Sequence, residues 1–285
     1  MKKAFVPIIS ILIIFLVYGC TEKIDIKLDS TYIRLIVDAR ITTDTTKQTV
    51  ILTKTASYYD NSAPIPVTGA VITIDDGTNT ISFAENPLNP GVYETPNNVY
   101  GVVGKIYNLT IKNVDVQNTG IKQVYNATTT IYPPVKLDSV QAVYNIKRDN
   151  YRLYTFFKDP HEKNYYVFDV YKNGVLQTDS LNEVRFFNDA LINGNYIYGL
   201  PIGRFVNPSD SLGDFGKKYS LLTVELRSVS EDYYNFLVGV QAAMAPQIPL
   251  FSGPPANVKG NINNGAFGFF LGYSSTRISM YVLRQ

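Results

Sequence analysis

The sequence predicts a mainly β protein built as antiparallel sandwiches, with a single helix near its C-terminal end. Apolar and polar residues alternate with a period of two over most of the chain, as they do in strands that bury one face. Turn signals rich in Gly, Pro and Asn separate these segments about every 8 to 12 residues, a spacing typical of sandwiches. Strand and helix patterns do not alternate regularly, so a parallel α/β sheet is not expected.

The first predicted domain covers residues 31–134. Its opening strand places Ile33, Leu35, Val37, Ala39 and Ile41 on one face, with charged residues on the other. Further strands are expected at residues 49–56, 70–75, 80–83, 107–111 and 124–131, with turns at residues 76–77, 89–91 and 101–104 between them. Pro133 and Pro134 cannot donate to a strand ladder, so they mark the end of this domain.

The second predicted domain, residues 135–285, is β-rich in the same way. Strands are expected at residues 140–147, 151–157, 165–171, 194–205, 219–227 and 278–282. Asn173 and Gly174 form a tight hairpin signal within it. Along residues 219–227, the leucines and valine at 222, 224 and 226 are expected to face inward, while Thr223, Glu225 and Arg227 face the other way.

A helix near residues 229–244 interrupts the strand pattern. Apolar residues recur there at helical spacing, at Tyr233, Phe236, Leu237, Val240 and Met244. Ser228 followed by Glu231 predicts a capping box at its start, and Pro246 predicts its end. A lone helix in a β-rich chain is expected to cover a sheet or one end of a sandwich.

The N-terminal segment is the most specific signal in the chain. Lys2 and Lys3 precede an uncharged apolar run at residues 4–17, which is shorter than the roughly 20 residues that span a membrane. Gly19 then precedes Cys20, the only cysteine, in an arrangement similar to a bacterial lipobox. Residues 1–19 are therefore predicted to be a lipoprotein signal peptide, Cys20 the lipidated residue and residues 20–30 a tether to the membrane.

Charge and cysteine content narrow the classes of partner. Cleavage before Cys20 leaves 24 of the 26 Lys and Arg residues against 24 Asp and Glu residues, so the mature net charge is near zero. No basic block remains, and nucleic acid is not an expected partner. With the only thiol acylated, no disulfide can form, and burial must stabilise the fold.

Candidate catalytic groups are scarce, so the sequence predicts a noncatalytic protein without cofactor or metal. His161 is the only histidine, and residues 159–162 predict a surface turn around it. One histidine and one acylated cysteine cannot form a zinc site of the usual composition. Asp214-Phe215-Gly216 matches part of a kinase motif, but the partner motifs are missing.

Aromatic residues after the helix are the candidate binding residues. The stretch from Pro246 to Tyr273 is far longer than the 4 to 6 residues of a typical connection, and it has little strand pattern until its end. Its aromatic residues are too apolar for a disordered linker: Phe251, Phe267, Phe269, Phe270 and Tyr273. These residues either contribute to a surface that contacts a ligand or transporter, or bury under the helix and complete the core.

Several loose motifs together resemble a known family. They are the lipobox, residues 58–61 and 64–71, Gly91-Val92-Tyr93, residues 104–109, 164–166, 185–188 and 230–233, Gly260-Asn261-Ile262, and Gly272-Tyr273-Ser274. Over nearly the whole chain the sequence is similar to the Bacteroidota lipoproteins grouped as domain of unknown function 4249. The glycine and tyrosine pattern of the first domain is also similar to prealbumin-like modules, so we expect a prealbumin- or Ig-like antiparallel sandwich there.

The resemblance implies an outer-membrane lipoprotein, often encoded beside a TonB-dependent transporter, and it supplies no catalytic residues. We therefore expect a lipid-anchored binding or accessory component of a nutrient uptake system. A structural or adhesive surface lipoprotein is the alternative, and an enzyme of unrecognised type is the third hypothesis.

Overall fold

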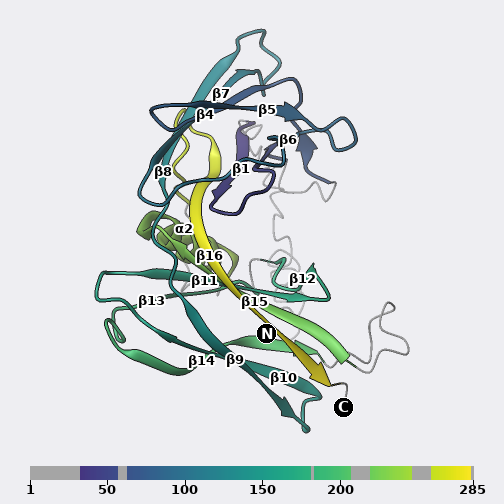
Figure 1. Ribbon diagram of the computed structural model, residues 1–285. Coiled ribbons are helices and arrows are strands. Elements are labelled where there is room, and N and C mark those ends of the chain that lie inside the picture. The colour runs from purple at the N-terminus through teal and green to yellow at the C-terminus, as the bar shows by residue number, and fades with distance from the viewer. Residues whose placement is uncertain (1–32, 57–62, 181–182, 207–218, 246–257, 284–285) are drawn as a thin grey trace, which may run out of the picture. The chain divides into compact units, whose positions relative to one another are not determined.

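Strands make up most of the protein in the computed structural model, which describes residues 33–56, 63–180, 183–206, 219–245 and 258–283 (Figure 1). The predicted signal peptide and tether, which include Cys20, lie outside the described residues. The candidate binding residue Phe251 also lies outside them. The first strands are β1 (Leu35–Thr42), β2 (Thr49–Lys54), β3 (Ile65–Pro66), β4 (Val71–Asp75), β5 (Thr80–Glu85), β6 (Val92–Glu94), β7 (Ile106–Val114) and β8 (Gln123–Thr130). The later elements are β9 (Leu137–Asn145), β10 (Asn150–Lys158), β11 (Tyr165–Lys172), β12 (Val175–Leu176), β13 (Arg185–Asn188), β14 (Tyr196–Val206), β15 (Tyr219–Val229), α2 (Glu231–Met244) and β16 (Phe267–Leu283).

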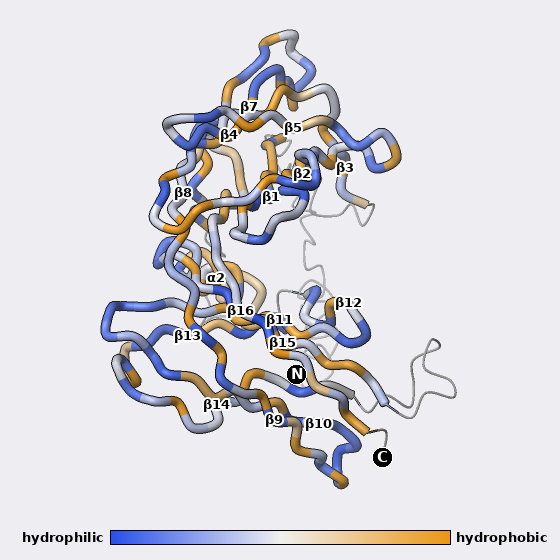
Figure 2. Tube along the Cα trace, viewed as in Figure 1, coloured by the Kyte–Doolittle hydropathy of each residue, from blue (hydrophilic) through white to orange (hydrophobic). Residues whose placement is uncertain are grey.

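The strands form one large sheet and one small sheet. The large sheet has the order β12-β11-β15-β16-β1-β2-β6-β5-β4-β7-β8, with β13 beside β11 and β3 beside β2. The small sheet has the order β14-β10-β9. The mainly β prediction is confirmed, and each strand expected from the alternation is present within a few residues of its predicted bounds, except the last, which begins 11 residues before its predicted start at residue 278. Figure 2 shows the alternation of hydrophobic and hydrophilic residues along these strands.

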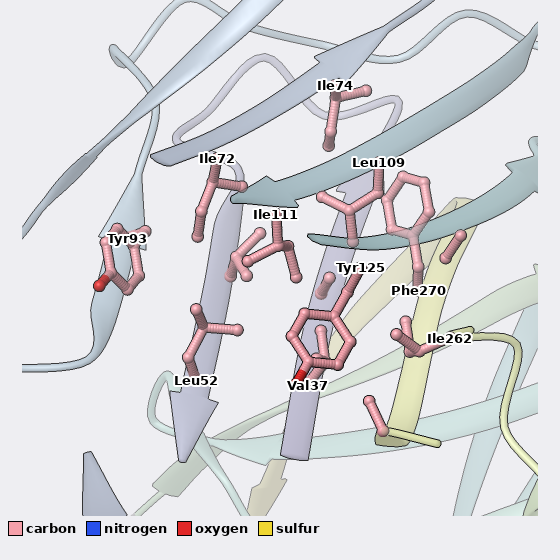
Figure 3. Close-up of a cluster of buried hydrophobic side chains, with 14 of the residues drawn as sticks. Val37, Leu52, Ile72, Ile74, Tyr93, Leu109, Ile111, Tyr125, Ile262 and Phe270 are labelled. Atoms are coloured by element: carbon pink, nitrogen blue, oxygen red, sulfur yellow. The ribbon is translucent and has the colours of Figure 1, made fainter. Parts of the chain in front are cut away.

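The first hydrophobic core lies inside the part of the large sheet that runs from β1 to β8. The predicted inward face of β1 is buried from Leu35 to Ile41, whereas Ile33, before the strand, is 41% exposed. Figure 3 shows side chains from β2, β4, β6, β7 and β8 meeting those of β1 around Leu109 and Ile111. The Tyr93 hydroxyl donates to the Val67 carbonyl oxygen at 2.9 Å, so this ring is buried without losing its hydrogen bond.

The second core lies between the small sheet and strands β11, β15 and β16. Leu222, Val224 and Leu226 of β15 face this core, as the sequence predicted. They meet Leu153 and Phe157 of β10, which are completely buried. The C-terminal part of the chain is therefore a two-layer sandwich over one face of the large sheet.

β16 is a 17-residue strand that belongs to both parts of the large sheet. Its first part, from Phe267 to Tyr273, pairs parallel with β1, and its second part, from Ser274 to Leu283, pairs antiparallel with β15 (Figure 1). The sequence predicted only the last part, residues 278–282, as a strand. Phe270 lies in the first core and Val282 in the second, so both predicted domains share this strand, and residues 33–285 form one compact unit.

α2 packs on the face of the large sheet opposite the second core. Leu237 is its buried residue, and it contacts a third cluster that includes Val167 and Leu271. Its N-cap is Ser230, whose hydroxyl oxygen accepts from the Tyr233 backbone N–H at 3.2 Å. The predicted capping box of Ser228 and Glu231 is therefore wrong: the N-cap lies two residues later, and the N3 position is Tyr233, which cannot complete a box.

Ser228 belongs to β15 because the ladder with β16 reaches it and the ladder with β11 continues to Val229. Its hydroxyl oxygen accepts instead from the Val135 backbone N–H at 3.2 Å. The predicted helix end is confirmed, since α2 stops at Met244, two residues before Pro246.

Candidate functional site

The structure places the predicted binding aromatics on the first part of β16. Phe270 is completely buried in the first core, and Phe269 is 6% exposed beneath α2. Phe267 and Tyr273 are half-buried, and each ring lies under a guanidinium group, Arg34 at 5.0 Å and Arg227 at 5.3 Å. Two of these four residues are thus core residues, and the other two stack on cations along the same strand.

Residues 258–265, just before β16, close the first sandwich along the free edge of β8. The Asn261 amide nitrogen donates to the carbonyl oxygens of Thr128 at 3.2 Å and Phe270 at 2.9 Å. Its amide oxygen accepts from the Phe270 backbone N–H at 2.8 Å. One side chain therefore links β8 to β16 where no strand ladder connects them, and the Gly260-Asn261-Ile262 motif has a structural role.

Two glycines let these segments approach closely. A Cβ atom on Gly260 would lie 1.8 Å from the Gly268 carbonyl oxygen. A Cβ atom on Gly268 would lie 1.9 Å from the Val37 carbonyl oxygen, and the φ angle of Gly268 is +98°. Both positions exclude any side chain, so Gly268 is needed for the parallel contact between β1 and β16, and Gly260 for the contact of residues 258–265 with β16.

A group of charged side chains occupies the same face of the large sheet as α2. We call it the charged belt, and it consists of Asp38, Arg40, Asp44, Asp169, Glu225, Arg227 and Arg277. The sequence predicted that Glu225 and Arg227 would lie on the face opposite the core, which is correct, but they are only 1% and 7% exposed. Both faces of β15 are buried because the helix and neighbouring strands cover the second face.

The centre of the belt is an ion pair between Arg227 and Asp169, with an N···O distance of 2.6 Å. The two residues are diagonal neighbours across β15 and β11, since Arg227 pairs with Val167 and Asp169 with Glu225. Burial raises the pKa of Asp169, and the Arg227 guanidinium opposes that rise. The buried Nε of Arg227 has no hydrogen-bond acceptor among the described residues.

Arg277 joins this centre to the loop between β1 and β2. Its guanidinium lies 2.6 Å from a Glu225 carboxylate oxygen and 2.5 Å from an Asp44 carboxylate oxygen. The Tyr171 hydroxyl donates to the second Glu225 oxygen at 2.9 Å. Burial, together with the nearby Glu225 carboxylate, raises the pKa of Tyr171, so this hydroxyl remains a hydrogen-bond donor at neutral pH.

A cleft of about 360 Å³ lies at the exposed end of the belt. Its lining comes from β1, β2, β16 and the loop between β1 and β2, and includes Asp38, Arg40, Asp44, Tyr273 and Arg277. Gln48 fixes that loop, because its amide nitrogen donates to the carbonyl oxygens of residues 44, 46 and 99 at 2.8 to 3.3 Å. The cleft offers carboxylates, guanidiniums and hydroxyls on a fixed frame, which suits a polar ligand.

The carboxylates of this cleft are already paired with arginine. Asp38 is 2.8 Å from Arg40, and Asp44 is 2.5 Å from Arg277, measured between the nearest N and O atoms. No group of three or more His, Cys, Asp or Glu side chains within the described ranges is arranged to hold a metal ion. His161 is exposed in a bend, as predicted, and lies against Gly194 away from the lining of the cleft.

The belt could not be found from the sequence alone. Asp38, Asp169, Glu225 and Arg277 come from four strands that are far apart in sequence, and each has the pattern of an ordinary outward-facing residue. The one local signal is that β15 leads directly into α2, so a helix can fold back over its second face.

The chain belongs to the family described as "Domain of unknown function (DUF4249)", whose model matches residues 21–279. This confirms the family to which the motifs pointed. No curated protein matches the chain. In the part of the chain that the structure describes, no helix has the length and apolar character required to span a membrane.

Proposed function

We propose that this chain is a lipid-anchored, noncatalytic binding protein that works as an accessory component of a TonB-dependent uptake system in the outer membrane. The lipid would be attached at Cys20, and residues 33–285, the compact unit, would perform the binding. A bound lipid with several acyl chains holds firmly, since each buried methylene adds about 0.8 kcal/mol.

The binding role is supported by the ion pairs that the two carboxylates of the cleft form with arginine. Asp38 and Asp44 are held by Arg40 and Arg277, so these carboxylates lack the free position that a general base or nucleophile requires. The same charges suit recognition of a ligand, because side chains that ion pairs already hold in place lose little conformational freedom when the ligand binds. The transporter partner follows from what the family resemblance implies.

Anchoring is tested by metabolic labelling with a fatty-acid analogue in a Gram-negative host. The wild-type chain is expected to incorporate label and to fractionate with outer membranes, whereas Cys20→Ala is expected to do neither, because the chain has no other thiol. Label that persists in Cys20→Ala would contradict the anchor.

The transporter role is tested by affinity purification of the tagged, lipidated protein after mild cross-linking. A TonB-dependent barrel is expected among the purified proteins, and the Cys20→Ala chain is the control for capture that does not depend on the membrane. Firm anchoring without any barrel would favour the structural or adhesive alternative.

A further inference from the structure

A second cleft, distinct from the one at the charged belt, opens at the edge of the C-terminal sandwich. Its volume is about 640 Å³, and its lining comes from β10 and β14 of the small sheet and from β11 to β13 of the large sheet. Among the described residues that line it are three arginines, Arg152, Arg185 and Arg204, and a single carboxylate, Glu183. The lining therefore carries an excess of positive charge.

Arg152 and Arg204 lie directly opposite each other across β10 and β14. Directly opposed residues of an antiparallel pair point to the same side of the sheet, and two like charges in that arrangement repel. Among the described residues, neither of these two arginines makes an ion pair. The pair thus costs stability, and no described carboxylate, Glu183 included, is in ion-pair contact with either guanidinium.

Three other arginines on strands of this protein do form ion pairs. Arg40, Arg227 and Arg277 each have a carboxylate oxygen within 2.8 Å. The contrast distinguishes Arg152 and Arg204 as two guanidiniums whose counter-ion is not part of the described chain.

The backbone of β14 shapes the cleft at this point. Leu153 pairs with Gly203 and Tyr154 pairs with Pro201, so Ile202 is an extra residue in β14, a β-bulge. Bulges redirect neighbouring side chains and are common beside binding sites. The Ile202 side chain is 1% exposed and is anchored in the second core, which fixes the backbone on which Arg204 is carried.

We propose that this cleft binds a small anionic molecule through its carboxylate or phosphate group, with Arg152 and Arg204 as the anion-binding pair. A guanidinium presents two parallel N–H groups that match the oxygens of either anion. Val170 and Ile202 add apolar surface to the lining, and Gln177 and Thr178 add neutral polar groups, so a ligand with a carbon skeleton beyond the anion would be accommodated.

The inference deepens the binding role proposed above by naming a ligand class, but it needs neither the lipid anchor nor the transporter. The test therefore uses the full-length chain purified in a nonionic detergent, with no partner present. A failure here removes the anion site only, and a failure of the labelling or cross-linking experiment leaves the anion site standing.

Binding is measured by isothermal titration calorimetry at low salt, with inorganic phosphate and citrate as separate probes. Saturable binding of at least one probe is expected, and the stronger probe identifies which anion the site prefers. Arg152→Gln and Arg204→Gln are each expected to weaken binding by about tenfold or more, as the loss of a charge-assisted hydrogen bond does. Arg148→Gln, which removes an exposed arginine in the nearby turn between β9 and β10, is the matched control and should bind as the wild type does.

A thermal melt distinguishes a variant that has lost the anion site from one that has misfolded. Without anion, Arg152→Gln should melt at or above the wild-type temperature, because it removes the like-charge repulsion. The preferred probe should raise the melting temperature of the wild type and of Arg148→Gln but not of Arg152→Gln. The proposal is overturned if neither probe binds saturably, or if both arginine variants bind as well as the wild type.

Discussion

Replacing Asn261 by alanine tests whether one side chain closes the first sandwich. The substitution removes three hydrogen bonds, two to the backbone of Phe270 and one to the Thr128 carbonyl oxygen, at donor–acceptor distances of 2.8 to 3.2 Å. Each such bond contributes about 0.5 to 1.5 kcal/mol, and the two Phe270 backbone groups left behind are partly buried. The expected loss in the free energy of unfolding is therefore about 2 to 4 kcal/mol, a large share of the roughly 5 to 15 kcal/mol typical of a folded protein.

The assay is urea unfolding of residues 21–285, the body without Cys20, followed by far-UV circular dichroism because the chain contains no Trp. Asn261→Ala should lower the midpoint without a change in slope. Asn97→Ala is the control, since Asn97 is exposed in a turn and should change stability by less than about 0.5 kcal/mol. If Asn261→Ala changes stability no more than the control does, the side chain does not connect β8 to β16.

Asn261→Asp separates the donor from the acceptor. It keeps the oxygen that accepts from Phe270 N–H but places a carboxylate against two carbonyl oxygens, which raises the pKa of the new side chain in the folded state. An acid whose folded pKa is raised loses stability as the pH rises through its unfolded pKa of about 4 and then its folded pKa. The variant should therefore be closest to the wild type near pH 3 and furthest from it near pH 7, and the reverse trend would refute the assignment.

Three further substitutions test other parts of the structure. Gly268→Ala should prevent the parallel pairing of β1 with β16, because its Cβ atom would overlap a β1 carbonyl oxygen, and little soluble folded protein should be recovered; a normal melt would contradict this. Asp169→Asn leaves the Arg227 charge buried and unpaired, which should cost about 3 to 5 kcal/mol in urea unfolding, whereas Asp169→Asn combined with Arg227→Met should recover part of that loss. The hydrogen bond from Lys105, together with backbone N–H groups, lowers the pKa of Asp76 to about 2; Lys105→Met should raise that pKa, as measured by carboxyl NMR. The stability that Lys105 provides through Asp76 is present above about pH 4 and is lost as the pH falls toward 2, so variant and wild type should converge at low pH, and an unchanged Asp76 pKa would refute the contact.

Local patterns in the sequence were sufficient to predict the helix and most of the longer strands. The alternation in β1 and β15 reports which residues face a core, and the helical spacing from Tyr233 to Leu237 reports the face of α2, because both depend on neighbours within a few residues. The turn residues likewise predicted the hairpin at Asn173, whose φ angle is +51°.

The first residue of the helix could not be predicted from local patterns. Ser228 and Ser230 are both chemically suited to cap a helix, and the choice between them depends on how far β15 continues to pair with β11 and β16. That pairing involves residues far away in the sequence, so the capping pattern could not distinguish the two serines.

The predicted binding residues show the same limit. Phe269 and Phe270 lack alternation because both faces of β16 are covered at this point, one by α2 and the other by the first core. A strand buried on both faces has no period-two signal, so residues 267–273 read as a loop that ends in aromatic residues. In the structure they are the strand that joins the two sandwiches.

The sequence by itself determined the β class, the helix, the family and the prediction of a lipid anchor at Cys20, since each depends on a local pattern or on a whole-chain resemblance. Only the tertiary structure decided that Asp169, Glu225 and Arg227 form a buried belt and that Arg152 and Arg204 face each other at a cleft. The physical reason is that strand register and the covering of a second sheet face come from contacts between distant segments. Those contacts give a charged side chain its burial and its partner, and neither is encoded by the residues next to it.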